Sequence, residues 1–547
     1  MNGEAPAVFR GWQFLHACPM RVALISMTLL VPCFWQRHIE AGDLGSHVYN
    51  AWLAQLIHEG QAPGLYLAHQ WHNVLFDVFL LQVANLAGFV AAEKVAVSLF
   101  VLIFFWSVFA LLTALCGQPP WFLTPGIAML AYGYSFSMGF LNYYLSIGLA
   151  CWSLAIFLAK GRAKIDLLVA LAILPFIYAA HPIGFLFALS ATVYLALRNI
   201  LPGYWKLSLP IAAVAAAAAL HWILAARANL EIDWTKDAPF YAFNGADQLV
   251  LYGDQYSLLV RVAILFGVIC LMVDGLLRRR EKLSGWKILA LPLEFYVVAF
   301  AIPALLPENL RTAPDKAWIG LLTSRLTIIT AIFGLAVLGS LRPRKWHLAG
   351  FVLLAAGFFF FLRVDMICLN LVERSAETLL WRLPHGTRVI PKLSAMPDSR
   401  IEFVGHLADR ACIAHCFTYL NYEPPSKQFR VRALAGSPIA VDSYANYEAM
   451  TADTHVFQAR ELPLTLLYEC DGTVLTRLCL LDLAPGQTTE SAIMAARLAA
   501  APRTVADGDA NAKFDQLVAK PATVILRNAA VRRALAGELG GPSRVGQ

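Results

Sequence analysis

Two carboxylates in the first long polar segment, Glu40 and Asp43, are spaced to do acid–base chemistry. They come a few residues after the first strongly apolar segment, and His38 and His47 flank them. A carboxylate beside a hydroxyl nucleophile can accept its proton as the hydroxyl attacks. We therefore expect Asp43 to act as a base, with Glu40 as its partner or as a metal ligand.

The run that follows Asp43 supports structural alternatives. Residues 48–57 repeat apolar side chains at helical spacing, which predicts an amphipathic helix lying on a membrane surface. Aspartate and serine often cap the first turn of a helix, so Asp43 or Ser46 could be its N-cap. Asp43 and His47 are also one helical turn apart and could share a divalent ion, although two ligands do not make a metal site. These alternatives stay open on the sequence.

An arginine interrupts one of the late apolar segments. Arg325 lies within the run 318–329, about two helical turns from its expected outer end. An intramembrane arginine is costly and by default functional, and a guanidinium is well suited to binding phosphate. Arg311 and Lys316, in the short polar loop before this run, can add positive charge. We expect these three residues to bind a phosphate.

Further polar side chains are candidates for lining a substrate pocket. Each also has an ordinary structural role open to it, as a solvated loop residue or a helix cap. Apart from a divalent ion, the residues suggest no cofactor. The candidates are His47, His69, His72, Asp77 and His181.

The composition indicates what kind of molecule must position these residues. Of the 547 residues, 59% are hydrophobic and only 14% are charged. A soluble chain of this length carries far more charge, so we expect a polytopic α-helical membrane protein. The net charge of +7 is modest, and in a membrane protein such an excess of lysine and arginine indicates which loops face the cytoplasm. No nucleic-acid partner is therefore expected.

Apolar segments divide the chain up to residue 368 into about eleven expected spans, at roughly 20 residues per span. No small-residue cleavage site follows the first one, so we expect a retained helix rather than a signal peptide. The expected spans are 22–35, 95–115, 122–136, 138–158, 165–178, 183–197, 207–226, 258–277, 288–306, 318–341 and 348–367.

Basic clusters predict the orientation of these spans. Lysine and arginine are enriched in cytoplasmic loops, and eleven spans with a cytoplasmic N-terminus put every cluster on that side. The long loop 36–94 and everything after about residue 368 are then expected outside. The clusters lie at 10–21, 160–164, 198–206, 278–282 and 342–345.

Residues 369–547 differ in character from the apolar part. Dispersed charges, short alternating runs and turn signals predict a mixed α/β domain outside the membrane, following a membrane domain over 1–368. Four cysteines in an oxidising compartment favour two disulfides. Cys412, His415 and Cys416 could instead hold a metal. The four cysteines are Cys412, Cys416, Cys470 and Cys479.

The order of these parts resembles the GT-C class of integral-membrane glycosyltransferases, which includes protein O-mannosyltransferases and lipid A aminoarabinose transferases. The shared features are a first span, an acidic outer loop with two membrane-parallel helices, a multi-span core and an outer C-terminal domain. In that class an aspartate of the first outer loop is the catalytic carboxylate, and Asp43 stands in its place. Several families carry a paired Asp-Glu there, whereas Glu40 and Asp43 are three residues apart.

The resemblance implies an enzyme of the inner cell membrane that moves a sugar from a polyprenyl-phosphate donor to an extracytoplasmic acceptor. That donor and membrane lipids would be its partners, and the sequence identifies neither the sugar nor the acceptor. A secondary transporter is an alternative, but the chain has no obvious internal repeat and few intramembrane acids. An envelope glycan polymerase or ligase is another, but the loop 307–316 is short for one.

Overall fold

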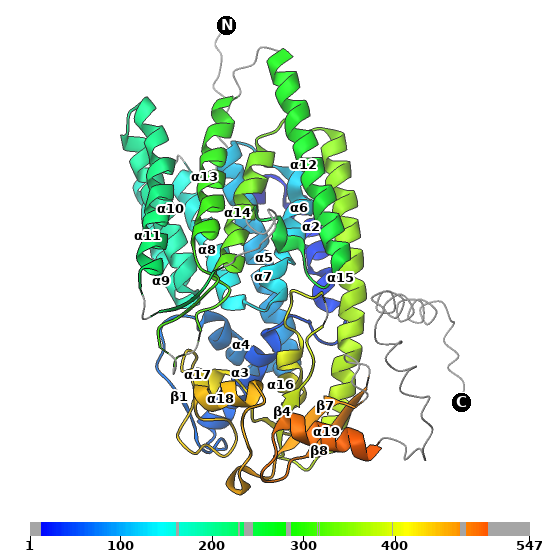
Figure 1. Ribbon diagram of the computed structural model, residues 1–547. Coiled ribbons are helices and arrows are strands. Elements are labelled where there is room, and N and C mark those ends of the chain that lie inside the picture. Colours follow the sequence, from blue (N-terminus) through cyan, green and yellow to red (C-terminus); the bar gives the residue numbers. More distant parts are fainter. Residues whose placement is uncertain are drawn as a thin grey trace, which may run out of the picture. The chain divides into compact units, whose positions relative to one another are not determined.

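Long apolar helices form much of the chain (Figure 1). The computed structural model describes residues 13–500 except 160–162, 228–229, 235–243, 281–285, 314–315, 317, 397 and 471–476. Within these residues, seven helices are long and apolar enough to cross a membrane. They are α5 (Phe89–Cys116), α8 (Leu141–Leu158), α10 (Pro182–Ile200), η3 (Gly203–Leu207) with α11 (Ser208–Ala225), α12 (Asp254–Arg280), α14 (Leu322–Gly339) and α15 (Lys345–Leu380).

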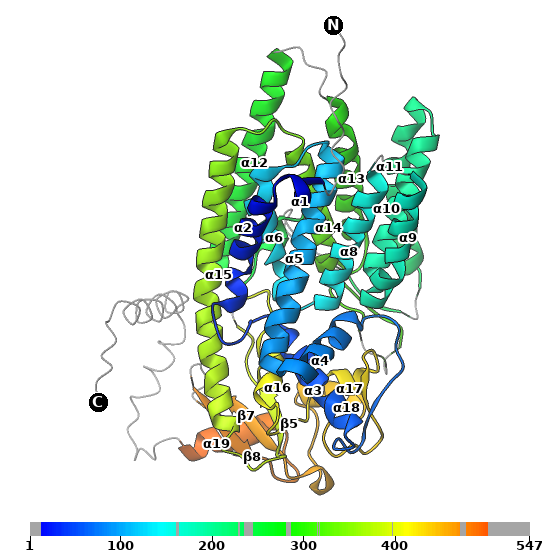
Figure 2. The same cartoon turned by 180° about the vertical axis from the view of Figure 1, so that it is seen from behind.

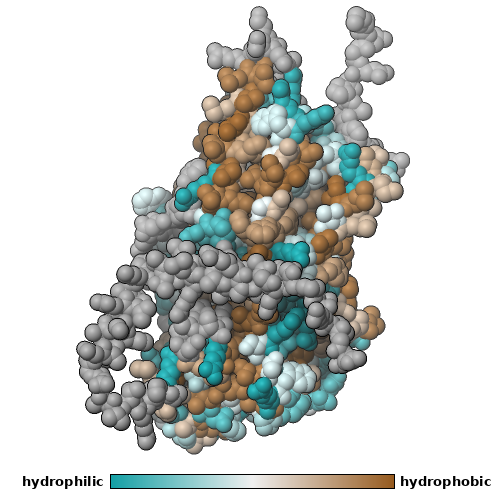
Figure 3. All heavy atoms as spheres, turned by 90° about the vertical axis from the view of Figure 1, so that its right-hand side faces the viewer, coloured by the Kyte–Doolittle hydropathy of each residue, from teal (hydrophilic) through white to brown (hydrophobic). Residues whose placement is uncertain are grey.

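The outer faces of these helices are apolar. Figure 3 shows a broad hydrophobic surface over one side of the molecule. On α12 and α15, the side chains of Leu265, Met272, Leu353 and Phe360 are each at least 60% exposed. Apolar side chains exposed over several helical turns are stable against lipid rather than water. The chain is therefore a multi-helical membrane protein.

The expected count of eleven spans is not confirmed. Three expected spans correspond to shorter apolar helices: α2 (Pro19–Leu30) with η1 (Val31–Phe34), α9 (Ala163–Ala180) and α13 (Trp286–Leu305).

The expected span 122–136 is not one continuous helix. This segment forms η2 (Trp121–Leu123), α6 (Thr124–Ala131) and α7 (Tyr134–Ser137). It breaks at Gly133, where an added Cβ would lie 2.5 Å from the carbonyl oxygen of Gln248, so only glycine allows this approach.

The loop after the first apolar helix contains α3 (Leu44–His58), β1 (Leu65–Leu67) and α4 (Leu75–Ala87). Figures 1 and 2 both show α3 and α4 between the long helices and the part of the chain that follows α15 (Lys345–Leu380), residues 381–494, which we call the tail. Every residue of α3 from Leu44 to Ala54 is buried, including the polar Ser46, His47 and Asn50. The polar face of this amphipathic helix is therefore not solvated, because residues of the C-terminal part cover it.

The C-terminal part contains both strands and helices. β4 (Arg388–Lys392) is parallel to β5 (Phe417–Thr418) and β7 (Thr465–Glu469), and β7 is antiparallel to β8 (Leu478–Asp482). The helical elements are η6 (Val404–His406), α16 (Leu407–Ala411), α17 (Glu423–Ser426), α18 (Tyr444–Thr451), η7 (Ala459–Glu461) and α19 (Thr489–Ala500).

The expected domain boundary at 368 falls inside α15, which continues to Leu380. Residues Met1–Met494 form one compact unit and Ala495–Gln547 a second, of which the structure describes only the end of α19. Strand pairing joins distant parts of the first unit: β1 pairs with β6 (Val431–Ala433), and β2 (Glu231–Asp233) pairs with β3 (Asn309–Arg311). The remaining short elements are α1 (Gln13–Ala17) and η5 (Ala246–Leu249).

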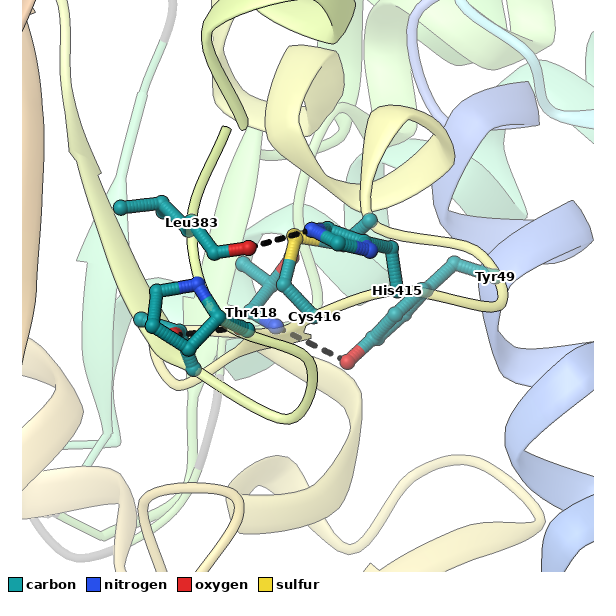
Figure 4. Close-up of a disulfide and its surroundings, with 8 residues drawn as sticks. Tyr49, Leu383, His415, Cys416 and Thr418 are labelled. Carbon is teal, nitrogen blue, oxygen red and sulfur yellow. Dashed lines mark hydrogen bonds between the residues drawn. A yellow bond between two sulfur atoms is a disulfide. The ribbon is translucent and has the colours of Figure 1, made fainter. Parts of the chain in front are cut away.

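The two expected disulfides are confirmed, as Cys412–Cys416 and Cys470–Cys479. A sulfur in a disulfide is not a thiolate, so the alternative metal site at the first pair is wrong. Figure 4 shows how this region contacts α3: the Thr418 amide donates to Tyr49 Oη at 2.9 Å. The tail is thereby fixed against the helix that follows Asp43.

Candidate functional site

A cavity of about 720 Å³ brings together distant parts of the chain. It is lined by residues from the segments 43–47, 69–73, 140–143, 178–183, 318–325 and 427–432. Its wall combines aromatic rings with charged and histidine side chains, which suits a ligand with both polar and apolar parts. Of the residues singled out from the sequence, those that line it are Asp43, His47, His69, His72, His181 and Arg325.

Asp43 is held in place by its own backbone. Its amide donates to the carbonyl of Met138 at 2.9 Å, and the Gly42 amide donates to Ser137 at 2.8 Å. The two segments are in close contact, because a Cβ added to Gly139 would lie 2.5 Å from the Asp43 nitrogen. Gly139 also has a φ of +77°, which favours glycine.

The side chain of Asp43 does not cap α3. The residue occupies the N-cap position, but its carboxylate makes no capping hydrogen bond. Instead, Oδ1 lies 3.3 Å from Nε2 of His406, which comes from the tail. Burial alone would raise the pKa of Asp43, but the hydrogen bond and charge of His406 outweigh it. With smaller contributions from the charges of His47 and Arg325, the pKa is lowered below its ordinary value.

His47 forms the second charged contact in this wall. Its Nδ1 lies 2.6 Å from Asp77 Oδ1, and the amide of Asn142 donates to Asp77 Oδ2 at 2.8 Å. Burial lowers the pKa of His47, but the charge and hydrogen bond of Asp77 raise it to about 9. Asp77 therefore acts through His47 and lies behind the cavity wall rather than on it.

A buried carboxyl lies next to this pair. Ser46 donates to Glu423 at 3.3 Å, and burial raises the pKa of Glu423 to about 8, against the opposing charge of His47. The polar face of α3 continues through Asn50, whose side chain accepts from Asn421 at 2.9 Å.

Arg325 lies in the first turn of α14. Its guanidinium is 4.2 Å from the ring centre of Phe140, and its Nε is buried without a hydrogen-bond partner. No carboxylate among the described residues forms an ion pair with it. Its position is fixed through the backbone, since Tyr143 Oη donates to the Arg325 carbonyl at 2.7 Å. A cation held in this way is available to an anionic ligand.

The three remaining histidines line the cavity, and each also contacts a neighbouring residue. His69 lies against Trp71, with ring centres 5.1 Å apart, and His72 lies against Tyr178 at 5.9 Å. His181 accepts a hydrogen bond from the Ile183 amide at 3.2 Å and so caps α10.

Glu40 does not line the cavity. Its carboxylate accepts from Arg410 at 2.8 Å, and the same guanidinium contacts Glu93 at 3.1 Å and Glu373 at 2.6 Å. Burial raises the pKa of Glu40, and the charge of Glu373 adds to this effect, against that of Arg410. This buried cluster joins the first loop, α5, α15 and α16, which gives Glu40 a structural contact in place of the expected pairing with Asp43.

Arg311 and Lys316 do not line the cavity either. Arg311 forms ion pairs with Glu448 at 2.7 Å and Glu231 at 3.4 Å, and Lys316 is exposed. Of the three cations expected to bind a phosphate, Arg325 alone lines the cavity.

Local sequence patterns do not indicate the tail residues of the site. His406, Lys427 and Arg432 lie more than 350 positions after Asp43, and no local pattern links them to it. Lys427 and Arg432 line the cavity, and His406 contacts Asp43 from behind its wall. The one available signal was His406 with Asp409, a histidine and a carboxylate one helical turn apart.

Metal ligands are grouped elsewhere. Among the described residues, three potential ligands within 4.8 Å of one another occur at His38, Glu373 and Glu377, not at Asp43 and His47. Arg410 already binds Glu373 through both carboxylate oxygens. A divalent ion would have to compete with that guanidinium, so this group does not fit a metal well.

No family model, curated protein or solved structure matches the chain. What the chain does must therefore be argued from the cavity. It offers a carboxylate with a lowered pKa at Asp43, a cation at Arg325 that has no carboxylate partner among the described residues, and aromatic walls between membrane helices and tail. This set can accept a proton from one ligand group and bind the negative charge of another.

Proposed function

We propose that the protein is a membrane glycosyltransferase that moves a sugar from a polyprenyl-phosphate donor to an extracytoplasmic acceptor. The observation that carries this proposal is that Asp43 and Arg325 line the same cavity. The carboxylate can accept the proton of the acceptor, and the arginine, which has no carboxylate partner among the described residues, can bind a phosphate leaving group. The resemblance of the chain's order of parts to the GT-C class points the same way.

The chemistry follows from the two charges. The acceptor hydroxyl attacks the anomeric carbon of the donor sugar, and a carbon–oxygen bond forms. The bond from that carbon to the phosphate oxygen breaks, and the phosphate leaves with the electron pair. Asp43 accepts the hydroxyl proton, and Arg325 stabilises the negative charge that grows on the phosphate.

The apolar parts of the cavity suit the lipid part of such a donor. Phe140, Tyr143, Ile183 and Leu322 line it beside Arg325. Since α14 is one of the long apolar helices, a polyprenyl chain could reach the guanidinium from the bilayer. In this proposal the chain crosses the inner membrane about eleven times, with its N-terminus cytoplasmic and its tail, a mixed α/β domain, outside.

The test is sugar transfer from a polyprenyl-phosphate donor by Asp43→Asn protein in isolated membranes. Asparagine keeps the size of the side chain but removes its charge, so we expect the rate to fall by roughly 100-fold or more. Asp254→Asn is the matched control, since Asp254 is exposed at the start of another helix. Full turnover by Asp43→Asn would contradict the proposal and reopen the transporter alternative.

A further inference from the structure

We infer that His406, anchored by Asp409, is a positioning residue that orients Asp43 toward the cavity and keeps it charged. Its effect on turnover rests on the proposed function, whereas the contact itself can be tested without any sugar transfer. The tail would then complete the site rather than only cover it.

Three side chains form a connected line from the tail to the cavity wall. His406 Nδ1 lies 2.9 Å from Asp409 Oδ2, and His406 Nε2 lies 3.3 Å from Asp43 Oδ1. Both ring nitrogens therefore face carboxylates. An imidazolium, which carries a proton on each nitrogen, is the form that donates to both.

Packing holds the histidine in this position. A Cβ added to Gly45 would lie 2.8 Å from the His406 carbonyl oxygen, so the backbone of His406 lies directly against α3. The ring of Tyr422 lies 5.1 Å from the imidazole on another side. Asp409 is 1% exposed, so water screens its charge little. These contacts leave the imidazole little freedom to turn away from Asp43.

His406 is also the one ion-pair partner of Asp43 among the described residues. His47 and Arg325 add positive charge near the carboxylate, and Tyr422 and the buried Glu423 are the other titratable groups close to it. Burial lowers the pKa of His406, but its hydrogen bonds to Asp409 and Asp43 raise it to about 10. The imidazolium thus offsets the cost of keeping Asp43 ionised in a partly buried position, where its side chain is 24% exposed.

The contact with His406 makes the Asp43 carboxylate a weaker base but fixes its orientation. A carboxylate with a lowered pKa is a weaker base, but it stays ionised well into the acid range. A fixed, charged oxygen can orient the acceptor hydroxyl and receive its proton late in the transfer. His406 itself is already protonated and accepts no proton from the acceptor.

The pH dependence of transfer distinguishes this role from a merely structural one. In wild-type protein, protonation of Asp43 should reduce the rate only at strongly acid pH. In His406→Gln the positive charge is lost while the burial remains, so the acid limb should move up by about one pH unit or more. We expect His406→Lys, which keeps the charge, to retain an acid limb near that of wild type despite a lower maximal rate.

His455→Gln is the matched control. His455 pairs with Glu461 at 3.0 Å elsewhere in the tail, and its side chain is about as buried as that of His406. This variant should leave the acid limb where it is. A uniform loss of rate at every pH in His406→Gln, with no displacement of the acid limb, would overturn the inference.

A double-mutant cycle tests the contact without any assay of transfer. Asp43→Asn, His406→Gln and the double variant are compared by thermal unfolding of the purified full chain. Residues in contact give shifts of the melting temperature that do not add, whereas independent residues give additive shifts. Additive shifts refute the contact itself. Non-additive shifts together with full turnover by Asp43→Asn refute the proposed function but leave the contact standing. If His406→Gln does not accumulate, Asp409→Asn takes its place in the pH experiment, with a smaller expected shift, and His406→Asn takes its place in the cycle.

Discussion

Two arginines in apolar helices should respond in opposite ways when each is replaced by leucine. Arg325 has no carboxylate partner among the described residues, whereas Arg198 of α10 donates to Glu294 at 2.8 and 3.0 Å. If Arg325 binds the donor phosphate, Arg325→Leu should weaken donor binding and leave stability nearly unchanged. Arg198→Leu should leave donor binding unchanged and lower stability, because Glu294 loses its ion-pair partner and keeps the hydrogen bond from Tyr194 at 3.0 Å.

The magnitudes follow from these contacts. A hydrogen bond to a charged group contributes about 1.5–3 kcal/mol, so losing the phosphate contact at Arg325 should weaken binding by about 10- to 100-fold. Arg325→Leu also removes the contact with Phe140, which contributes about 1 kcal/mol for a half-buried cation, but it removes the buried Nε without a hydrogen-bond partner as well, so the two effects on stability offset each other. Lysine at this position keeps the charge but not the planar fork, so it should restore binding in part. Arg198→Leu should cost about 1.5–3 kcal/mol of stability.

The assay is binding of a polyprenyl phosphate to purified protein in lipid nanodiscs, with thermal unfolding measured on the same samples. Using one preparation for both readouts separates a lost ligand contact from a damaged fold. Wild-type affinity in Arg325→Leu would refute the phosphate role. Arg325 would then be a structural hydrogen-bonding group of the helix bundle.

Three further predictions concern charge and topology. Because the pKa of His47 is raised to about 9, the stability that its charge contributes is lost as pH rises through about 9. In Asp77→Asn, thermal unfolding at several pH values should show this loss of stability at lower pH, and an unchanged pH dependence would contradict the role of Asp77. Arg410→Met should cost about 3–5 kcal/mol of unfolding free energy, measured by denaturation, because buried carboxylates lose their shared cation; an unchanged midpoint would contradict this. A reporter fused after Arg344 should read cytoplasmic and one after Gln547 external, and an external signal after Arg344 would refute the proposed orientation.

Several parts of the candidate site could be anticipated because their signals are local. Apolar runs of helical length predict membrane helices, and a charge within such a run stands out at once, as Arg325 does. The acidic loop before a helical pattern singled out Asp43 in the same way. Six of the residues chosen on such grounds line the cavity.

Local pattern could not say which residues Glu40 and Asp43 contact. Both are acids near one membrane helix, yet Glu40 contacts Arg410 and Asp43 contacts His406, each more than 360 residues away in the chain. The same limit explains α3, whose apolar residues at helical spacing suggested a membrane surface. Its polar side chains are instead buried against the tail, through contacts such as Ser46 with Glu423.

Helix formation depends on hydrogen bonds and side-chain spacing within a few turns, so it can be predicted from the local sequence. The charge state of a buried carboxylate depends on which cation packs against it, and a one-dimensional pattern carries no record of that neighbour. Composition and periodicity thus sufficed for a helical membrane protein with a charged site. Tertiary packing alone separated the carboxylate of Asp43, on the cavity, from that of Glu40, in a buried ion cluster.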